Sequence, residues 1–263
     1  MARGKSSSVE GSQHITWSYR EGHKTNDIPW GPHKLPVAVD LADVSIITEK
    51  NAHGFLYRRD GAGEKVEKSV LADKGNLYFY PIEPLHKPEK VSAHLLIEFD
   101  QPVVIEPRAG KVIKVTFPLE LACMVDRRRV GEHVLDIFTL CPPKFTLYGN
   151  VKDGLICKYW KSAVHNGDPA VNPLEQGIMK IEIQNLLGRW AEVRRAVFSA
   201  YGMKLYYGPK MVSLNATMKI NSELTAETSF SDQPLQPGMR KAPEQFSSRL
   251  LSLPGRTVME EGY

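Results

Sequence analysis

Residues 212–230 alternate between apolar and polar side chains over nineteen positions, with only Ser222 and Thr228 interrupting the apolar set. Successive side chains of a β-strand point to opposite faces of a sheet, so the pattern predicts a strand with one face in a core and the other in water. A straight strand of this length would span roughly 60 Å at ~3.3 Å per residue. We therefore expect the run to bend or split, with Asn221-Ser222 as the breaking point.

Shorter alternating or aromatic runs, separated by turn residues, recur along most of the chain, which predicts an all-β protein built as an antiparallel β-sandwich with few or no helices. A strand is favoured over a helix for Arg189–Tyr201, because Gly188 makes a hairpin turn before it. At most one short C-terminal helix is expected, over Pro243–Leu251. The other expected strands lie in residues 55–57, 77–80, 91–99, 111–121, 134–140, 145–148, 155–160 and 179–183.

The composition predicts three regions. Residues 1–32 are expected to form a flexible N-terminal tail holding at most one short strand, because the stretch has little apolar content. Residues 33–230 are expected to form the β-sandwich core, and residues 231–263 a polar C-terminal extension. The alternative is two β-subdomains that divide near residues 127–132, the most polar interruption of the core.

Charge and cysteine usage narrow the partners and the location. The formal net charge of +4 is too small by itself to favour a polyanionic partner. The sharpest basic cluster, Arg127–Arg129, is expected on a loop in contact with solvent, so nucleic acid is an unlikely partner. The three cysteines are odd in number and lie in apolar or strand-like segments, so no disulfide framework is expected. No apolar run is long enough to span a bilayer. These features predict a cytoplasmic protein without a membrane span.

The sequence contains no motif that specifies a reaction. The eight histidines show no spacing typical of a metal site, and glycine-rich phosphate loops and the nucleophile elbow are missing. We therefore assign no catalytic residue, no metal ligand and no cofactor.

One aromatic and basic cluster is the best candidate for ligand binding. It lies on an expected hairpin whose turn is Gly149–Gly154, and it places lysines beside aromatic rings, which can stack on a ring while pairing with an anion. The alternative is that these are ordinary sheet aromatics covered by lysine stems. The candidate residues are Lys144, Tyr148, Lys158, Trp160 and Lys161.

Three segments of the chain resemble a known family: residues 145–161, residues 201–207, and the strand pair 96–107 that leads to Thr116-Phe-Pro118. They are similar to the archaeal family known as domain of unknown function 432, over about residues 35–230. The resemblance implies an archaeal, cytoplasmic protein and brings no catalytic residues.

The expected function is a non-enzymatic binding or interaction module whose partner is an anionic or ring-bearing small ligand or a protein. A hydrolase or a sugar-active enzyme on a β-sandwich is the alternative, and a weak nucleic-acid binder comes third. A concave pocket with two or more buried ionisable groups would favour the enzyme, and a flat aromatic and basic surface would favour the binder.

Overall fold

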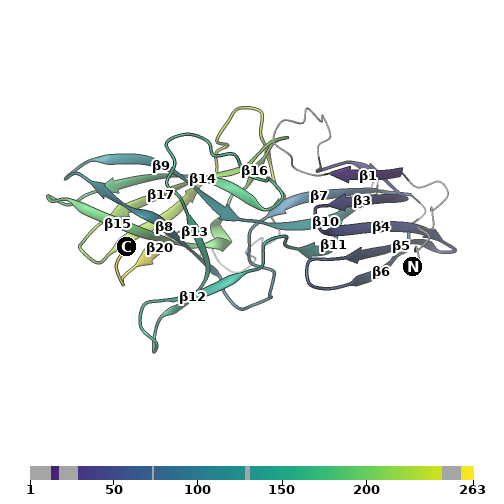
Figure 1. Cartoon of the computed structure of the whole chain (residues 1–263), viewed down its shortest axis with the longest axis horizontal. Helices are drawn as coiled ribbons and strands as arrows, with labels where there is room; N and C mark the ends of the chain where they lie inside the picture. The colour runs from purple at the N-terminus through teal and green to yellow at the C-terminus, as the bar shows by residue number, and fades with distance from the viewer. Residues whose placement is uncertain (1–12, 18–28, 73, 128–130, 245–255) are drawn as a thin grey trace, which may run out of the picture. The chain divides into compact units, whose positions relative to one another are not determined.

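A computed structural model describes residues 13–17, 29–72, 74–127, 131–244 and 256–263. In these residues the chain forms twenty β-strands and one short 3₁₀ helix, Ala200–Gly202. The protein is therefore all-β and sandwich-like, as the alternating sequence pattern predicts (Figure 1).

Contacts within the chain define two compact units. Unit 1 comprises residues 1–80 and 122–140, and unit 2 comprises residues 81–121 and 141–263. The chain thus passes between the units three times. The division into regions that we expected from the sequence stays a prediction.

Unit 1 contains a five-stranded sheet and most of a four-stranded sheet. The first has the order β1-β3-β4-β5-β6, with β1 parallel to β3 and every other pair antiparallel. Its strands are β1 (Gln13–Trp17), β3 (Val37–Leu41), β4 (Val44–Asn51), β5 (Gly54–Asp60) and β6 (Val66–Val70). The second has the order β11-β10-β7-β2, from β11 (Gly131–Phe138), β10 (Glu120–Arg127), β7 (Asn76–Ile82) and β2 (His33–Lys34).

The core of unit 1 lies between these sheets. Side chains on alternate positions of β3 and β4 are buried, as expected for strands with one face in a core. The sheets also contact each other through polar groups, because Tyr57 and Arg59 on β5 both donate hydrogen bonds to Asp136 on β11.

Unit 2 contains a four-stranded and a seven-stranded sheet. The four-stranded sheet has the order β12-β13-β8-β15, from β12 (Lys144–Tyr148), β13 (Leu155–Ser162), β8 (His94–Ile105) and β15 (Ala191–Ser199). The path β19-β16-β17-β14-β9 forms most of the other, from β19 (Arg240–Lys241), β16 (Tyr206–Tyr207), β17 (Val212–Ile220), β14 (Gln176–Asn185) and β9 (Gly110–Pro118). It is completed by β18 (Ala226–Ser231), which pairs with β17, and β20 (Arg256–Met259), which pairs with β18. Two pairs in unit 2, β13 with β8 and β14 with β17, are parallel.

The run at residues 212–230 splits as predicted, because β17 ends at Ile220 and β18 returns antiparallel to it. The apolar positions of β17 are buried and form one wall of the unit 2 core. Two positions depart from the simple pattern. Leu224, expected on the buried face, is 62% exposed because it lies in the turn between the strands, and Ser213, expected in water, is buried.

Other expectations have mixed outcomes. Residues 191–199 form a strand, so the preference for a strand over a helix is confirmed. The strand expected from Val91 begins only at His94, because the Ser92 side chain bonds to the backbone of His94 in place of a strand partner. Pro243 and Glu244 are not helical, and the rest of the expected C-terminal helix lies outside the described residues.

Candidate ligand-binding pocket

The segment between β7 and β8 lines a pocket in unit 2. Its volume is about 570 Å³, which falls within the roughly 300–1,000 Å³ typical of small-molecule sites. Apolar side chains and a few polar ones share the lining, which consists of Leu85, His86, Glu89, Lys90, Val91, Ser92, Ala93 and Tyr201. The pocket is therefore of a size and chemistry that suit a small ligand.

A buried carboxylate holds the backbone of this segment. Glu120, at the start of β10, is only 1% exposed, and its oxygens accept hydrogen bonds from the backbone N–H groups of His86 at 2.8 Å and Lys87 at 3.0 Å. A buried charge is tolerated only when it is paired and hydrogen-bonded. These two bonds therefore fix the lining segment at the point where it enters the pocket.

Lys158 supplies the opposite charge. Its ammonium group reaches from β13 to donate to Glu120 at 2.6 Å and to the carbonyl oxygen of Lys87 at 2.7 Å. Burial lowers the pKa of Lys158, and the negative charge of Glu120 opposes that shift. Lys158 and Glu120 together tie two strands to the pocket segment, and we call them the anchoring pair.

His86 is the one ionisable side chain of the lining that is largely buried. Its Nε2 lies 3.7 Å from a carboxylate oxygen of Glu83, which is itself buried. Glu89 and Lys90, which also line the pocket, are exposed.

Ser92 lies in the pocket wall, where its hydroxyl forms hydrogen bonds with backbone groups. Its hydroxyl donates to the carbonyl oxygen of Ile156 at 2.5 Å and accepts from the backbone N–H of His94 at 3.0 Å. These bonds commit the hydroxyl to the backbone, so the contacts of Ser92 favour a wall of fixed shape rather than a nucleophile.

The hairpin predicted to bind a ligand forms, but its register separates the five candidate residues. Lys144 lies opposite Tyr159, and Tyr148 lies opposite Leu155. Directly opposed residues share a face, and neighbours along a strand alternate. Lys144, Tyr148 and Lys161 therefore lie on one face of the sheet, and Lys158 and Trp160 lie on the other.

Burial also differs from the expectation of a single exposed patch. Tyr148 is buried, and its hydroxyl donates to the carbonyl oxygen of Gly262 at 2.9 Å and accepts from the N–H of Glu261 at 3.0 Å. Lys158 is buried in the anchoring pair. Trp160 is partly buried and donates its indole N–H to Thr116 at 2.9 Å.

Only the two outer lysines of the candidate set, Lys144 and Lys161, are exposed. Each ring in the set is tied by a hydrogen bond to another part of unit 2, because a partly buried polar group needs a partner. The five residues therefore do not form one exposed aromatic and basic surface, and ligand binding by them stays a prediction.

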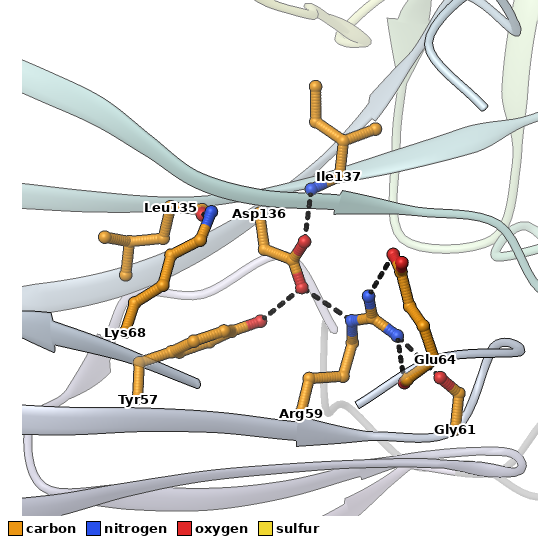
Figure 2. Close-up of polar contacts among 8 residues, drawn as sticks. All are labelled: Tyr57, Arg59, Gly61, Glu64, Lys68, Leu135, Asp136 and Ile137. Carbon is orange, nitrogen blue, oxygen red and sulfur yellow. Dashed lines mark hydrogen bonds and ion pairs between the residues drawn. The ribbon is translucent and has the colours of Figure 1, made fainter. Parts of the chain in front are cut away.

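Unit 1 contains a second cluster of buried ionisable groups, shown in Figure 2. The carboxylate of Asp136 accepts hydrogen bonds from the Tyr57 hydroxyl at 3.1 Å, from Arg59 at 2.5 Å and from the backbone N–H of Ile137 at 2.9 Å. The guanidinium of Arg59 also donates to Glu64 and to the carbonyl oxygen of Gly61.

The contacts of this cluster indicate a structural role. Burial would lower the pKa of Arg59, but the hydrogen bond and the charge of Asp136 outweigh it, so the pKa is raised. Burial raises the pKa of Tyr57 and of the neighbouring thiol of Cys123 well above their usual ranges. A fully paired arginine beside two groups that stay protonated holds β5 against β11 and offers no reactive atom to a ligand.

The described residues contain neither a cluster of metal ligands nor a helix that could span a membrane. No group of three or more His, Cys, Asp or Glu side chains among them is placed to hold a metal ion. No helix within the same residues is long and apolar enough to cross a membrane. The three cysteines are free thiols.

The fold defines an all-β protein with sandwich-like units, and a family can be assigned within that class. The model of the family described as protein of unknown function (DUF432) matches residues 29–260, so the chain belongs to this family. No curated protein and no solved structure matches the chain.

Sequence reasoning missed the pocket. Pro84 and Pro88 lie in the segment that follows β7, and two prolines so close together mark a loop. Loops on a rigid scaffold often carry binding residues. The two prolines could therefore have indicated a loop at this place. The contacts of Glu120, Lys158 and Tyr201 with this loop could not be predicted, because these residues are far from it in the sequence.

Proposed function

We propose that this chain is a non-enzymatic binding module whose unit 2 pocket takes a ring-bearing small ligand, with any anionic group of that ligand facing His86 and Lys90. The observation that carries the proposal is a pocket of about 570 Å³ whose lining segment is fixed by the anchoring pair. Fixing a loop before the ligand arrives reduces the entropy lost on binding.

The lining supports this ligand class. Leu85, Val91 and Tyr201 offer apolar contact, and an aromatic side chain such as Tyr201 packs well against a flat ring. His86 and Lys90 offer donors for a carboxylate or phosphate. Because Glu89 also lines the pocket, a ligand with one anionic group suits the balance of charge better than a polyanion.

The proposal favours binding over catalysis for a specific reason. Among the described ionisable side chains that line the pocket, only His86 is largely buried, and the hydroxyl of Ser92 is engaged by backbone groups. The two or more buried ionisable groups that would favour an enzyme are therefore not gathered on the lining.

A thermal-shift screen tests the proposal. The purified chain is heated with a panel of aromatic carboxylates, mononucleotides and matched neutral aromatic amides. A ligand present at about 100 times its Kd stabilises the folded state by about 2.7 kcal/mol, which corresponds to a rise in Tm of about 5–11 °C for a unit of this size. Ring-bearing anions are expected to give the largest shifts.

Three variants localise the effect. Tyr201→Ala and Lys90→Ala are expected to lose most of the shift, and Lys90→Ala is expected to lose it selectively for the anionic members of the panel. Lys219→Ala removes an exposed lysine on β17, outside the pocket, and is the matched control. An equal loss in the control, or full retention in both pocket variants, would contradict the proposal.

A hydrolase remains the second candidate because of the Glu83 and His86 pair. A carboxylate can orient an imidazole and support its role as a general base. Chromogenic esters, glycosides and phosphate esters test this alternative directly. Turnover that is lost in His86→Ala, while the variant keeps the wild-type Tm, would favour the enzyme over the binding module.

The remaining expectations belong to the same proposal. We place the protein in an archaeal cytoplasm, supported by three free thiols of which two are buried. Protein partners and the Lys144–Lys161 hairpin as a ligand surface also stay predictions. Arg128 and Arg129 of the basic cluster lie outside the described residues, and weak nucleic-acid binding stays a prediction.

A further inference from the structure

A second hollow in unit 2 lies away from the residues of the first pocket. Its volume is about 320 Å³, and three separate segments line it: the start of β15 with the residues before it, the turn between β17 and β18, and residues 262–263. The lining residues are Leu187, Arg189, Trp190, Ala191, Glu192, Glu223, Gly262 and Tyr263.

Trp190 dominates this hollow. Trp190 is 65% exposed, and its indole N–H makes no hydrogen bond to any residue in the described part of the chain. An exposed indole exposes a large apolar surface to water, and tryptophan is the residue type most enriched where such surfaces bind a partner. The fold does not use this side chain for its own core.

The walls around Trp190 are held in place. The backbone N–H of Gly262 donates to the carbonyl oxygen of Leu224 at 3.0 Å, and the Tyr263 hydroxyl donates to the carbonyl oxygen of Ser222 at 3.2 Å. These bonds attach residues 262–263 to the turn between β17 and β18. The hollow is therefore formed by connected segments and not by one loose loop.

Among the described residues that line the hollow, Arg189 is the one basic side chain, and Glu192 and Glu223 are acidic. Arg189 forms an ion pair with Glu223, and Glu192 accepts a hydrogen bond from Arg194 at 2.7 Å. No surplus of positive charge is left to attract a phosphate or a carboxylate. The same groups offer both donors and acceptors, which neutral hydroxyl groups can use together.

We propose that this hollow binds a neutral saccharide ring, stacked on the indole of Trp190. The weakly positive C–H face of a sugar ring suits the negative face of an indole, and its hydroxyl groups suit a rim of paired arginines and carboxylates. The assignment stands on Trp190 and its neighbours and does not depend on the ligand of the first pocket.

The test is a titration of the whole chain with neutral oligosaccharides of glucose, mannose, galactose and N-acetylglucosamine, followed by tryptophan fluorescence and by calorimetry. At least one is expected to bind and change the emission. Trp190→Ala is expected to weaken binding by about tenfold or more, and Trp190→Phe, which keeps a ring, is expected to weaken it less. Tyr78→Ala, which removes an aromatic ring of unit 1 outside both pockets, is the matched control.

Several outcomes would overturn the assignment. One is that no neutral oligosaccharide binds with a Kd below about 10 mM. Others are that Trp190→Ala binds as tightly as the wild type, or that Tyr78→Ala loses as much affinity as Trp190→Ala. Tighter binding of mononucleotides than of sugars at this site would also overturn it. If Trp190→Ala does not fold, as judged by circular dichroism, Glu192→Gln replaces it and is expected to weaken binding several-fold. Failure here with success of the thermal-shift screen leaves the first pocket unaffected.

Discussion

The anchoring pair makes a sharp prediction about stability. Replacing Lys158 with methionine keeps most of the side-chain volume but removes the ammonium group that lies 2.6 Å from Glu120. Glu120 is 1% exposed, so its carboxylate would stay buried with only the two backbone N–H groups of His86 and Lys87 as partners. The loss of the bond to the Lys87 carbonyl oxygen adds to the damage.

The expected cost follows from the burial of both charges. Breaking a buried ion pair from one side typically costs about 3–5 kcal/mol, because the remaining charge is left uncompensated. For a unit of this size, that loss lowers Tm by about 6–20 °C. Replacing both partners removes the stranded charge, so the double variant Lys158→Met with Glu120→Gln is expected to recover part of the loss.

Urea denaturation followed by circular dichroism measures these effects as changes in the transition midpoint. Lys161→Met is the matched control, because Lys161 is exposed on the same strand and its loss should change stability by less than about 0.5 kcal/mol. If Lys158→Met changes the free energy of unfolding by less than about 1 kcal/mol, or if the double variant is less stable than the single one, the reasoning about the anchoring pair is refuted.

Three further predictions concern other parts of the chain. Leu214→Asp should lower the free energy of unfolding, measured in denaturant melts, by several kcal/mol because it buries a charge. Leu224→Asp, at a largely exposed turn position, should lower it by about 0.5 kcal/mol or less. Equal losses would contradict the placement of the turn. Asp136→Ala should cost about 3–5 kcal/mol because it strands a buried guanidinium, while Glu64→Ala, whose side chain is half-exposed, should cost less than about 1 kcal/mol. Burial raises the pKa of Cys141 to about 11, so alkylation of this thiol should be slow at neutral pH. As the pH is raised towards 11, the alkylation rate should increase about tenfold for each pH unit. A rate that levels off near pH 8 would contradict this prediction.

The strands could be predicted from the sequence because their signal is local. Alternation at residues 212–230 depends only on the period of a strand, and it located both β17 and β18 together with the break between them. The burial of Ser213 and the exposure of Leu224 could not be read in the same way. Both depend on what packs against the strand or on where the turn falls.

The candidate site was harder to predict because it depends on register and on distant contacts. A shift of one residue between two strands moves every side chain to the other face, and the register of β12 and β13 places Tyr148 and Trp160 on opposite faces. The partner of Lys158 is Glu120, on a distant strand. No spacing rule links residues so far apart in the chain.

The most direct test of the proposed binding module is a crystallographic screen in which crystals of the whole chain are soaked with ring-bearing carboxylates and their neutral amides. The account predicts that bound fragments gather in the pocket of unit 2, with their rings against Tyr201 and their anionic groups towards His86 and Lys90. Fragments that bind only elsewhere on the molecule, or none in this pocket, would contradict it.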